Sequence, residues 1–528
     1  MTLEPPAPTS PLSPPSPPRE HVALHALFAH WAAHTPQAPA VVDATGTHGY
    51  GALWQRAGQV AAALRGHGVR QDEVVATVLP RTAEQVVALL GILQAGGALL
   101  ALDPAQPPAR LRALTEDAGV RIVITDGSVE PPDGVSWEAV TLDALAATGS
   151  AAAATTGPAD VSATALACLL YTSGSTGRPK GVLLTHAAVT NYARHQAESF
   201  ALGPDDRVAQ RAPYTSDAAL SELVMAFAVG AAVVVLPLEA LATPDAFART
   251  LEQHRISMLT IVPSLLAPLV ADQVFTRCPS LRVVVSVGEQ LTRSLAADFA
   301  RQNPAALYNL YGPSEAGIGV TAHRVTGTEP GSTIPIGHAS AGLRVHVCSP
   351  DGEALAPLTP GELYVGGAQL SRGYLNRPAL TAERFVPDPF SGLPGARLYR
   401  TGDRVRRQLD GSLEFVGRVD GQLKLRGVRV EPGEIEAAIQ RHPAAKQAAV
   451  TVLTGGPGPD LLVAFVEWEG QTDGVPRALR SHLRVLLPAP MIPAVFHALP
   501  AFPLLPSGKT DRQSLADLAV RLRTESPR

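Results

Sequence analysis

A loop rich in glycine and hydroxyl side chains is the part of this sequence whose residue types best fit a chemical task. Residues 171–181 read YTSGSTGRPKG and follow an apolar run at 166–170. Glycines let the backbone N–H groups approach a ligand closely, and hydroxyl groups and a lysine add donors and positive charge. These features suit a polyphosphate. The spacing is not that of the ordinary P-loop, because Lys180 is followed by Gly181 instead of Ser or Thr. A solvent-exposed flexible loop is the alternative.

Six further segments each contain glycine or proline, and all but the fifth also contain acidic, basic or aromatic residues. They are 93–104 (LQAGGALLALDP), 308–315 (YNLYGPSE), 399–403 (YRTGD), 417–427 (GRVDGQLKLRG), 487–493 (LPAPMIP) and 506–512 (PSGKTDR). Together with the loop, and in this order, they resemble the signature segments of adenylate-forming enzymes, the superfamily of acyl-CoA synthetases, luciferases and nonribosomal peptide synthetase (NRPS) adenylation domains. The resemblance runs from about Tyr50 to Arg512. Any one segment can match by chance, so the common order supports the assignment.

The resemblance implies that the loop binds the β- and γ-phosphates of ATP. The residues it assigns to this contact are Thr172, Ser173, Gly174, Ser175, Thr176, Gly177 and Lys180. It also implies that Glu315 holds Mg²⁺ together with the phosphates, a task for which a carboxylate is suited. The alternative for Glu315 is a carboxylate favoured at the start of a helix by the helix dipole.

The nucleoside part of ATP is assigned to a second group of residues. Asp403 offers two acceptor oxygens to the two hydroxyls of a ribose, although an isolated Thr-Gly-Asp is more often a turn. Tyr311, beside Gly312, is implied to stack on adenine, and Phe415 to cover the nucleotide. Core packing is the commoner role of an aromatic side chain. Arg418 is implied to pair with the ribose or the α-phosphate, and an ordinary solvated arginine is its alternative.

Lys509 is the residue that we expect to act in catalysis, together with Glu315 and Arg418. A carboxylate that attacks the α-phosphate brings two anions together, and an ammonium between them offsets the repulsion and stabilises the developing charge. Read alone, a Gly-Lys near the end of a chain is a surface feature. The resemblance further implies that the C-terminal domain rotates about Asp420 and brings Gly427 toward a thiol channel. A plain turn residue is the alternative for Asp420.

Asp217 is implied to pair with the ammonium of an amino acid, and the alternative is an N-cap for a helix that starts at Ala218. Peptide synthetase domains usually read Phe-Asp-x-Ser here, whereas this chain reads Ser-Asp-Ala-Ala at 216–219. The lost phenylalanine opens space beside the carboxylate, as a β-amino acid would require. The substrate pocket carried over by position is Asp217, Ala218, Ser221, Thr260, Val285, Val287, Leu310, Ile318, Gly319 and Lys509.

The pocket predicts the class of side chain that is bound. No charged residue lines its side-chain wall, which disfavours a charged substrate side chain. Its first five positions resemble pockets for aromatic side chains, while Val287 and Leu310 are bulkier than such pockets usually have. We therefore expect an apolar or aromatic amino acid, and the choice between α and β stays open.

A thiol acceptor is expected from outside this sequence. The chain continues about 16 residues beyond Arg512 and shows no Leu-Gly-Gly-x-Ser motif for phosphopantetheine attachment. A discrete acyl or peptidyl carrier protein with a phosphopantetheine arm is therefore the expected partner, in natural product (antibiotic) biosynthesis, and a small activator protein is a further candidate. An acyl- or aryl-CoA ligase that uses free CoA is the second hypothesis, and Asp217 argues against it. A catalytically idle nucleotide-binding module is the third, and the intact Lys509, Glu315 and Asp403 argue against it.

The elements that must position these residues predict an α/β fold. Buried strands are expected at 74–79, 122–125, 233–236, 258–262 and 281–287, with helices at 83–94, 186–200, 220–229, 244–254 and 291–301. Such alternation indicates helix-covered, mostly parallel sheets. Short strands after about residue 330 predict a small barrel-like β subdomain. Strands at 423–425, 448–453 and 461–468 and helices near 434–441 and 476–487 predict a small mobile α+β C-terminal domain.

The expected division is a Pro-rich tail at 1–20, a large domain at 21–418, a hinge at 419–422, a small domain at 423–520 and a tail at 521–528. A chain of 528 residues is too long for one core. The formal charge of −4 gives no reason to propose nucleic acid or an anionic membrane as partner. The three cysteines lack metal-type spacing and fit a reducing cytoplasm. The Pro-rich start has no basic and apolar parts of a secretion signal.

Overall fold

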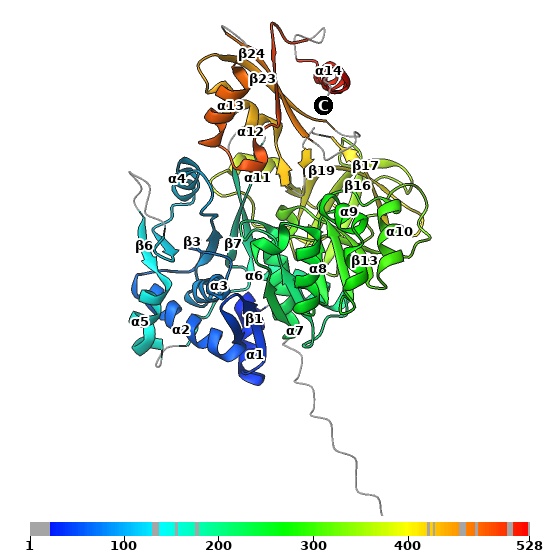
Figure 1. Cartoon of the computed structure of the whole chain (residues 1–528). Coiled ribbons are helices and arrows are strands. Elements are labelled where there is room, and N and C mark those ends of the chain that lie inside the picture. Colours follow the sequence, from blue (N-terminus) through cyan, green and yellow to red (C-terminus); the bar gives the residue numbers. More distant parts are fainter. Residues whose placement is uncertain are drawn as a thin grey trace, which may run out of the picture.

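The computed structural model describes residues 22–128, 137–153, 157–174, 179–419, 423–425, 428–453, 461–469, 474–503 and 510–525. Two large sheets with helices between and around them form the large domain, and the C-terminal part lies above them as a separate lobe (Figure 1). The fold class predicted from the sequence is confirmed: a large, mostly parallel α/β domain is joined to a smaller α+β domain.

The first large sheet has nine strands in the order β15-β14-β13-β12-β11-β9-β10-β1-β2. The strands are β1 (Pro39–Asp43), β2 (Gly46–Gly49), β9 (Arg207–Gln210), β10 (Ala232–Val235), β11 (Met258–Ile261), β12 (Val283–Val287), β13 (Ala306–Tyr311), β14 (Thr321–Arg324) and β15 (His338–Ala339). The six strands from β1 to β13 in this order are parallel to their neighbours, and the edge strands are antiparallel. The carboxyl ends of β11, β12 and β13 therefore lie at one edge of the sheet.

The second large sheet has six strands in the order β6-β5-β3-β4-β7-β8. They are β3 (Val74–Val78), β4 (Ala98–Ala101), β5 (Ile122–Thr125), β6 (Glu138–Thr141), β7 (Leu166–Thr172) and β8 (Lys180–Thr185). All neighbours are parallel except the hairpin of β7 and β8. This hairpin encloses the glycine- and hydroxyl-rich loop, so the loop leaves the sheet at the carboxyl end of a buried strand.

Helices fill the space between the two sheets and cover their outer faces. In chain order they are α1 (Leu24–His34), α2 (Tyr50–Gly66), α3 (Ala83–Ala95), α4 (Pro108–Asp117), α5 (Leu142–Ala153), α6 (His186–Ser199), α7 (Asp217–Val229), η1 (Leu238–Leu241), α8 (Pro244–Gln253), α9 (Pro263–Ala271), η2 (Val274–Arg277), α10 (Arg293–Gln302), η3 (Ser314–Ala316) and α11 (Pro378–Arg384). Every residue of α3 except Glu84 is buried. A helix that is apolar all round is buried on all sides, and α3 fits between the sheets for that reason.

The strands follow the period of two that a sheet with both faces covered requires. In β12, Val283 and Val285 belong to the core between the sheets, whereas Val284 points to a second core on the opposite face. In β3, Val75 faces the central core, while its neighbours Val74 and Ala76 face a third core. One continuous core thus joins both sheets, and it fixes the positions of the strand ends that carry the candidate site.

A five-stranded antiparallel sheet completes the large domain, as the short strands after residue 330 predict. Its order is β16-β17-β19-β18, with β20 paired to β19. The strands are β16 (Leu343–Cys348), β17 (Pro360–Gly367), β18 (Phe385–Pro387), β19 (Arg397–Arg407) and β20 (Leu413–Arg418).

The small domain contains a hairpin and a three-stranded sheet in the order β23-β24-β25. Its elements are β21 (Leu423–Leu425), β22 (Val428–Val430), α12 (Pro432–Gln440), β23 (Ala445–Leu453), β24 (Leu461–Trp468), α13 (Val475–Arg484), η4 (Ala489–Met491), β25 (Val495–Leu499) and α14 (Arg512–Glu525). The core formed with α12 and α13 lies on one face of the sheet, and the core formed with α14 lies on the other. All of these core residues come from the small domain, so it has its own hydrophobic interior.

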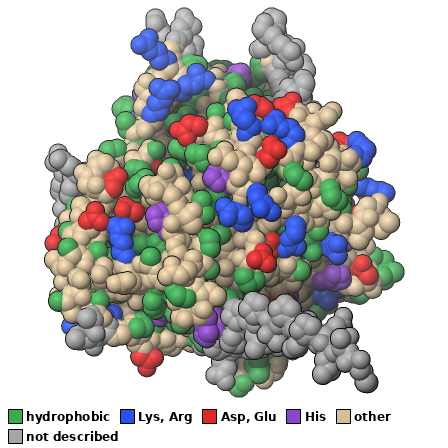
Figure 2. Space-filling model, turned by 60° about the horizontal axis from the view of Figure 1, so that its bottom comes forward, with side chains coloured by type: hydrophobic (Ala, Val, Ile, Leu, Met, Phe, Trp, Pro, Cys, Tyr) green, Lys and Arg blue, Asp and Glu red, His purple; other side chains and the backbone are tan. Residues whose placement is uncertain are grey.

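Most predicted elements end within two residues of the observed ones, but α7 starts earlier than expected, at Asp217. The predicted strand at 281–287 begins only at Val283, because the backbone N–H groups of Arg282 and Val283 bond to the carbonyl of Ser257 before the ladder starts. Lys, Arg, Asp and Glu side chains are interspersed on the face shown in Figure 2. Among the described helices, none combines the length and the apolar character needed to cross a membrane.

Candidate active site

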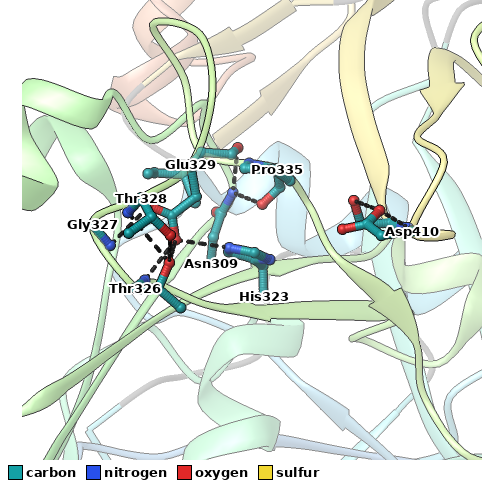
Figure 3. A network of polar contacts seen from close by, with 10 residues as sticks. Asn309, His323, Thr326, Gly327, Thr328, Glu329, Pro335 and Asp410 are labelled. Carbon is teal, nitrogen blue, oxygen red and sulfur yellow. Dashed lines mark hydrogen bonds and ion pairs between the residues drawn. The ribbon is translucent and has the colours of Figure 1, made fainter.

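The central strand of the candidate site is β13, which carries Leu310 and Tyr311 at its carboxyl end. Asn309, on the opposite face of the strand from Leu310, anchors it. Its side-chain amide donates to the carbonyls of Ile334 and Pro335 at 3.1 and 2.9 Å (Figure 3). These bonds connect β13 to the segment that leads into β15. They fix the position of the strand end that carries Leu310 and Tyr311.

Glu329 supports the neighbouring strand β14 in the same network (Figure 3). Its carboxylate accepts hydrogen bonds from the backbone and hydroxyl of Thr326, from the backbone of Gly327 and from His323 Nε2, at 2.5–3.0 Å. Burial alone raises the pKa of Glu329, but the hydrogen bonds from Thr326 and His323 outweigh it and hold the pKa at about 2. The carboxylate therefore stays charged and keeps the loop after β14 in place.

The Glu315 cluster consists of Lys180, Glu315 and Tyr374. Glu315 lies in the short helix η3 directly after β13 and is fully buried, with Lys180 Nζ 3.2 Å from its Oε1. The hydroxyl of Tyr374 donates to the same oxygen at 3.0 Å, and the ammonium of Lys180 lies 5.0 Å from the centre of the Tyr374 ring. The carboxylate of η3, shortly after β13, is thus paired with the lysine that starts β8. Tyr374 was missed by sequence reasoning, since no spacing signal marks it.

The Asp403 cluster consists of Tyr311, Asp403 and Arg418. Asp403 lies in β19 opposite Arg418 in β20, so the alternative of a plain turn does not apply to it. Arg418 Nη1 and the Tyr311 hydroxyl each donate to Asp403, at 2.5 Å, and use different carboxylate oxygens. Burial and the nearby Asp403 charge raise the pKa of Tyr311 well above its ordinary value. Phe415, also in β20, is partly buried and packs against the central core.

Asp217 is the first residue of α7, and the cap of this helix is Ser216, whose hydroxyl accepts from the backbone N–H of Ala219. The alternative that Asp217 is the N-cap is therefore wrong. Instead, the hydroxyl of Ser314 donates a hydrogen bond to Asp217 Oδ2. Ser314 is next to Glu315 in η3. The carboxylate assigned to the ammonium, Asp217, is therefore bound by the neighbour of Glu315, the carboxylate assigned to Mg²⁺ and the phosphates.

Four of the predicted pocket residues lie on one face of three neighbouring strands. Thr260 in β11 is the ladder partner of Val285 in β12, and Val287 is the partner of Leu310 in β13. Val285 and Val287 are two residues apart and so point to the same side. The carboxyl ends of strands in open α/β sheets are where ligands bind, and these side chains form one wall there.

Two further residues of the predicted pocket, Ser221 of α7 and Gly319, both lie against Tyr192 of α6, which sequence reasoning missed. The hydroxyls of Tyr192 and Ser221 are 2.6 Å apart and both are buried. A methyl group on Gly319 would lie 2.7 Å from the Tyr192 ring, so only glycine allows this contact. The preceding Ile318 has a φ of 80°, a strained value for a β-branched residue. The backbone of Gly319 thus closely approaches the ring of Tyr192 in this part of the predicted pocket.

The phosphate loop is described in part. Thr172 ends β7, Ser173 is buried, and the backbone N–H of Gly174 donates to Glu434 Oε2 of the small domain at 3.3 Å. The candidate residues Ser175, Thr176, Gly177, Asp420 and Lys509 lie outside the described residues, as does Gly427. Gly312 follows β13, where a methyl group would lie 2.2 Å from the carbonyl oxygen of Ile318. Ala218 occupies the second position of α7.

A divalent cation would rely on few protein ligands here. Within the described parts of the chain, no group of three or more His, Cys, Asp or Glu is arranged to hold a metal ion. Glu315 supplies the carboxylate oxygens that Mg²⁺ prefers, and Mg²⁺ is commonly held by one or two carboxylates plus substrate phosphates. The residues present therefore fit Mg²⁺ only as an ion that arrives with ATP.

Comparisons with known proteins show the family of this chain. Residues 28–375 match the model of the AMP-binding enzyme family, and residues 434–509 match that of the AMP-binding enzyme C-terminal domain. Phosphinothricin tripeptide synthetase PhsB from Streptomyces viridochromogenes is 39% identical over 94% of this chain and 42% of its own length. Tyrocidine synthase 3 from Brevibacillus parabrevis is 37% identical over 93% of this chain and 8% of its own length. The chain thus spans less than half the length of these relatives.

Solved structures show the same fold. PA1221 in its holo form, an NRPS protein containing adenylation and PCP domains bound to a vinylsulfonamide inhibitor, superposes with a TM-score of 0.82 at 30% identity. The match covers 93% of this chain and 84% of that one. The artificially fused adenylation-PCP di-domain NpsA-ThdA from Klebsiella oxytoca has a TM-score of 0.80 at 24% identity over 95% and 97% of the two chains. The second match bears on the fold alone.

The fold and the family match identify an ATP-using adenylate-forming enzyme, as the signature segments predict. The chain belongs to the AMP-binding enzyme family, and within it to the ligases that form adenylation domains of the NRPS type.

Proposed function

We propose that the protein activates an amino acid as its aminoacyl-AMP and then transfers the aminoacyl group to a carrier-protein thiol. The observation that carries the amino acid part is the position of Asp217, which is bound by Ser314, the neighbour of Glu315. A carboxylate in this place gives an ammonium group an anionic partner beside the phosphate site, and a charge-assisted hydrogen bond in a partly dry pocket is stronger than a surface pair.

The first half-reaction is a displacement at the α-phosphorus of ATP. A substrate carboxylate oxygen forms a bond to this phosphorus, and the bond to the pyrophosphate oxygen breaks. Lys509 is proposed to offset the repulsion between the two anions, and Arg418 to bind the α-phosphate or ribose. Glu315 would hold a Mg²⁺ that neutralises phosphate charge. Asp403 would bind the ribose hydroxyls, with Tyr311, Gly312 and Phe415 around the adenine.

The second half-reaction forms a thioester. The sulfur of a phosphopantetheine arm bonds to the acyl carbon, the acyl–phosphate bond breaks with AMP as leaving group, and the thiol proton is released. The likeness to structures with PCP domains supports a carrier protein as the kind of partner. A separate carrier, a small activator protein and a role in natural product biosynthesis remain part of the proposal. Buried free thiols at Cys168, Cys278 and Cys348 support a reducing compartment such as the cytoplasm.

The pocket wall supports an apolar or aromatic side chain, with the α or β position of the amino group as the open alternative. Val285, Val287 and Leu310 supply apolar surface along it. Thr260 adds a hydroxyl that is buried and has no hydrogen-bond partner among the described residues. A substrate with one polar group on its ring, such as a phenol, would satisfy it. A comparison of phenol and phenyl substrates, each as α- and β-amino acid, therefore discriminates most sharply.

ATP–pyrophosphate exchange over a panel of α- and β-amino acids tests the proposal. Exchange should depend on an amino acid and should be absent with the matching simple carboxylic acids, because these lack the ammonium that Asp217 binds. Asp217→Asn should reduce exchange about tenfold or more, which corresponds to one charged hydrogen bond. Asp245→Asn is the matched control, since Asp245 also lies in the first turn of a helix but is exposed.

The outcome also separates the alternatives. Exchange stimulated equally by simple acids, with free CoA as thiol acceptor, would instead support the acyl- or aryl-CoA ligase. Undiminished exchange in Lys509→Ala would contradict the catalytic role of Lys509.

A further inference from the structure

A carboxylate of the small domain contacts the phosphate loop of the large domain. Glu434, in α12, places Oε2 3.3 Å from the backbone nitrogen of Gly174 and Oε1 2.6 Å from Arg110 Nη1 in α4. The side chain of Glu434 is 2% exposed and that of Arg110 is 12% exposed. We call Arg110, Gly174 and Glu434 the Glu434 cluster. In Figure 1, α12 lies on the side of the small domain that faces the large domain.

The contact is specific because both carboxylate oxygens are used. A buried carboxylate is stable only when its charge is paired and its oxygens are hydrogen-bonded. Here one oxygen accepts a hydrogen bond from the guanidinium of Arg110, and the other accepts one from the backbone N–H of Gly174. Both donors belong to the large domain. If the small domain moved away, Glu434 and Arg110 would each have to be rehydrated or find new partners. The contact therefore distinguishes this domain arrangement from others.

The position of the amide gives the contact its consequence. Gly174 belongs to the loop assigned to the ATP phosphates, and a carboxylate oxygen and a phosphate oxygen are both anionic acceptors for the same N–H. The two acceptors cannot share one amide hydrogen at full strength, and a polyphosphate beside Glu434 would add repulsion between like charges. Binding of pyrophosphate or of the ATP tail should thus oppose the docking of Glu434.

We propose that Glu434 and Arg110 form a latch that docks the small domain on the phosphate loop once pyrophosphate has left, and that they are positioning residues for thiol transfer. The proposal rests on the proposed function for its kinetic role, but the competition between Glu434 and pyrophosphate does not. A ligand that binds only one of two arrangements shifts the balance toward that arrangement. Pyrophosphate should therefore open the latch, and its departure should close it.

Kinetics of the two half-reactions test the role. In Glu434→Gln, which keeps the shape and removes the charge, thiol transfer to the carrier protein should slow about tenfold, the effect of losing one charged hydrogen bond. ATP–pyrophosphate exchange should change by less than about twofold. Glu436→Gln is the matched control. It lies one half-turn further along α12, but its carboxylate pairs with Arg512 inside the small domain. Equal slowing of both half-reactions in Glu434→Gln would overturn the positioning role.

A distance measurement tests the latch without any catalysis. Spin labels on Ala113→Cys in α4 and Gln440→Cys in α12 report the separation of the domains, since both positions are exposed and the natural cysteines are buried. In the full-length protein, magnesium pyrophosphate without amino acid should shift the distances toward larger values. Glu434→Gln and Arg110→Gln should each show these larger values before pyrophosphate is added. Distances that are unchanged by pyrophosphate and by both substitutions would overturn the proposal, even if exchange activity is present.

Discussion

The Asp403 cluster and the Glu434 cluster both pair a buried carboxylate with an arginine, but they are built differently. Asp403 and Arg418 are partners in the β19–β20 ladder and belong to one sheet. Glu434 and Arg110 are 324 positions apart in the chain and belong to two domains. The first pair forms whenever its hairpin folds, whereas the second forms only when the domains dock.

This difference fits the two tasks that we propose for the site. A nucleotide-binding carboxylate works best when it is held in place before the ligand arrives, because no reorganisation is then needed. A contact that must change between half-reactions needs two arrangements of similar free energy, which a ligand can bias. The Asp403 cluster suits the first task and the Glu434 cluster suits the second. The predictions below test whether the two clusters behave in these different ways.

The largest effect is expected for Asp403→Asn. The change leaves the buried guanidinium of Arg418 without its anion, and breaking a buried pair costs about 3–5 kcal/mol. The free energy of unfolding of the large domain should fall, and kcat/KM for ATP should fall by about a hundredfold or more, since two charged hydrogen bonds are lost. Denaturant unfolding and exchange kinetics measure both. Asp410→Asn, in an exposed turn, is the control. Near-normal values of both quantities would mean that Asp403 is not part of a preformed site.

A somewhat smaller effect is expected for Lys180→Met. The substitution removes the ammonium that lies 3.2 Å from the buried Glu315 and that is assigned to the phosphates. Exchange should fall by about tenfold to a hundredfold in kcat/KM for ATP, as expected for loss of one or more charged hydrogen bonds. Lys180→Arg should recover part of the lost kcat/KM for ATP, because it restores a positive charge. Lys446→Met, whose side chain is more than half exposed, serves as the control. Equal activity in Lys180→Met and Lys446→Met would contradict the assignment of Lys180 to the ATP phosphates.

Arg110→Gln should have a moderate effect that is confined to the interdomain contact. Without its guanidinium partner, Glu434 competes less well for the Gly174 amide, so pyrophosphate should bind up to about tenfold more tightly. Isothermal titration calorimetry with magnesium pyrophosphate measures this change. Arg112→Gln lies on the same helix but pairs with Glu116 at the surface, and it should leave the affinity unchanged. Weaker pyrophosphate binding in Arg110→Gln would show that Arg110 contacts the phosphate itself.

The last prediction concerns the stability of the fold instead of ligand binding, and it involves Glu222, a fully buried carboxylate whose hydrogen bonds come from neutral amides. It accepts from the side chain of Gln210 and from the backbone of Arg211 and Ala212. Burial raises its pKa to about 7, although the nearby Arg211 charge acts in the opposite direction. Because the folded state holds this proton more tightly, its contribution to stability is fully present below pH 4.5 and is lost as the pH rises through 7.

Glu222→Gln should remove this pH dependence. Between pH 4.5 and 8, the wild type should lose up to about 3 kcal/mol of unfolding free energy relative to the variant. Denaturant unfolding at several pH values measures the difference, and Glu239→Gln at an exposed position is the control. Parallel pH profiles of wild type and Glu222→Gln would show that folding does not raise the pKa of Glu222.

The sequence allowed the fold class and most element positions to be predicted, because buried strands and helices have apolar periods that are local. It also placed Asp217, Glu315, Tyr311 and Asp403 in segments that the fold brings to the same sheet edges. The alternative that Asp217 caps α7 is wrong, since Ser216 and Asp217 are both good capping residues and only the start of the helix decides between them. Tyr192 and Tyr374 were not predicted, because a tyrosine that contacts a site from another element has no signature in its own neighbourhood.

Residue order alone determined that a glycine- and hydroxyl-rich loop follows a buried strand, that acidic residues lie in other signature segments, and that a second small core follows residue 430. These features depend on interactions within a few residues of the chain. Only the tertiary structure decided which oxygen meets which donor: Glu315 with Lys180, Asp403 with Arg418, and Glu434 with the Gly174 amide. The reason is that hydrogen bonds and ion pairs act over about 3 Å, a distance that packing of remote segments sets and that local sequence does not encode.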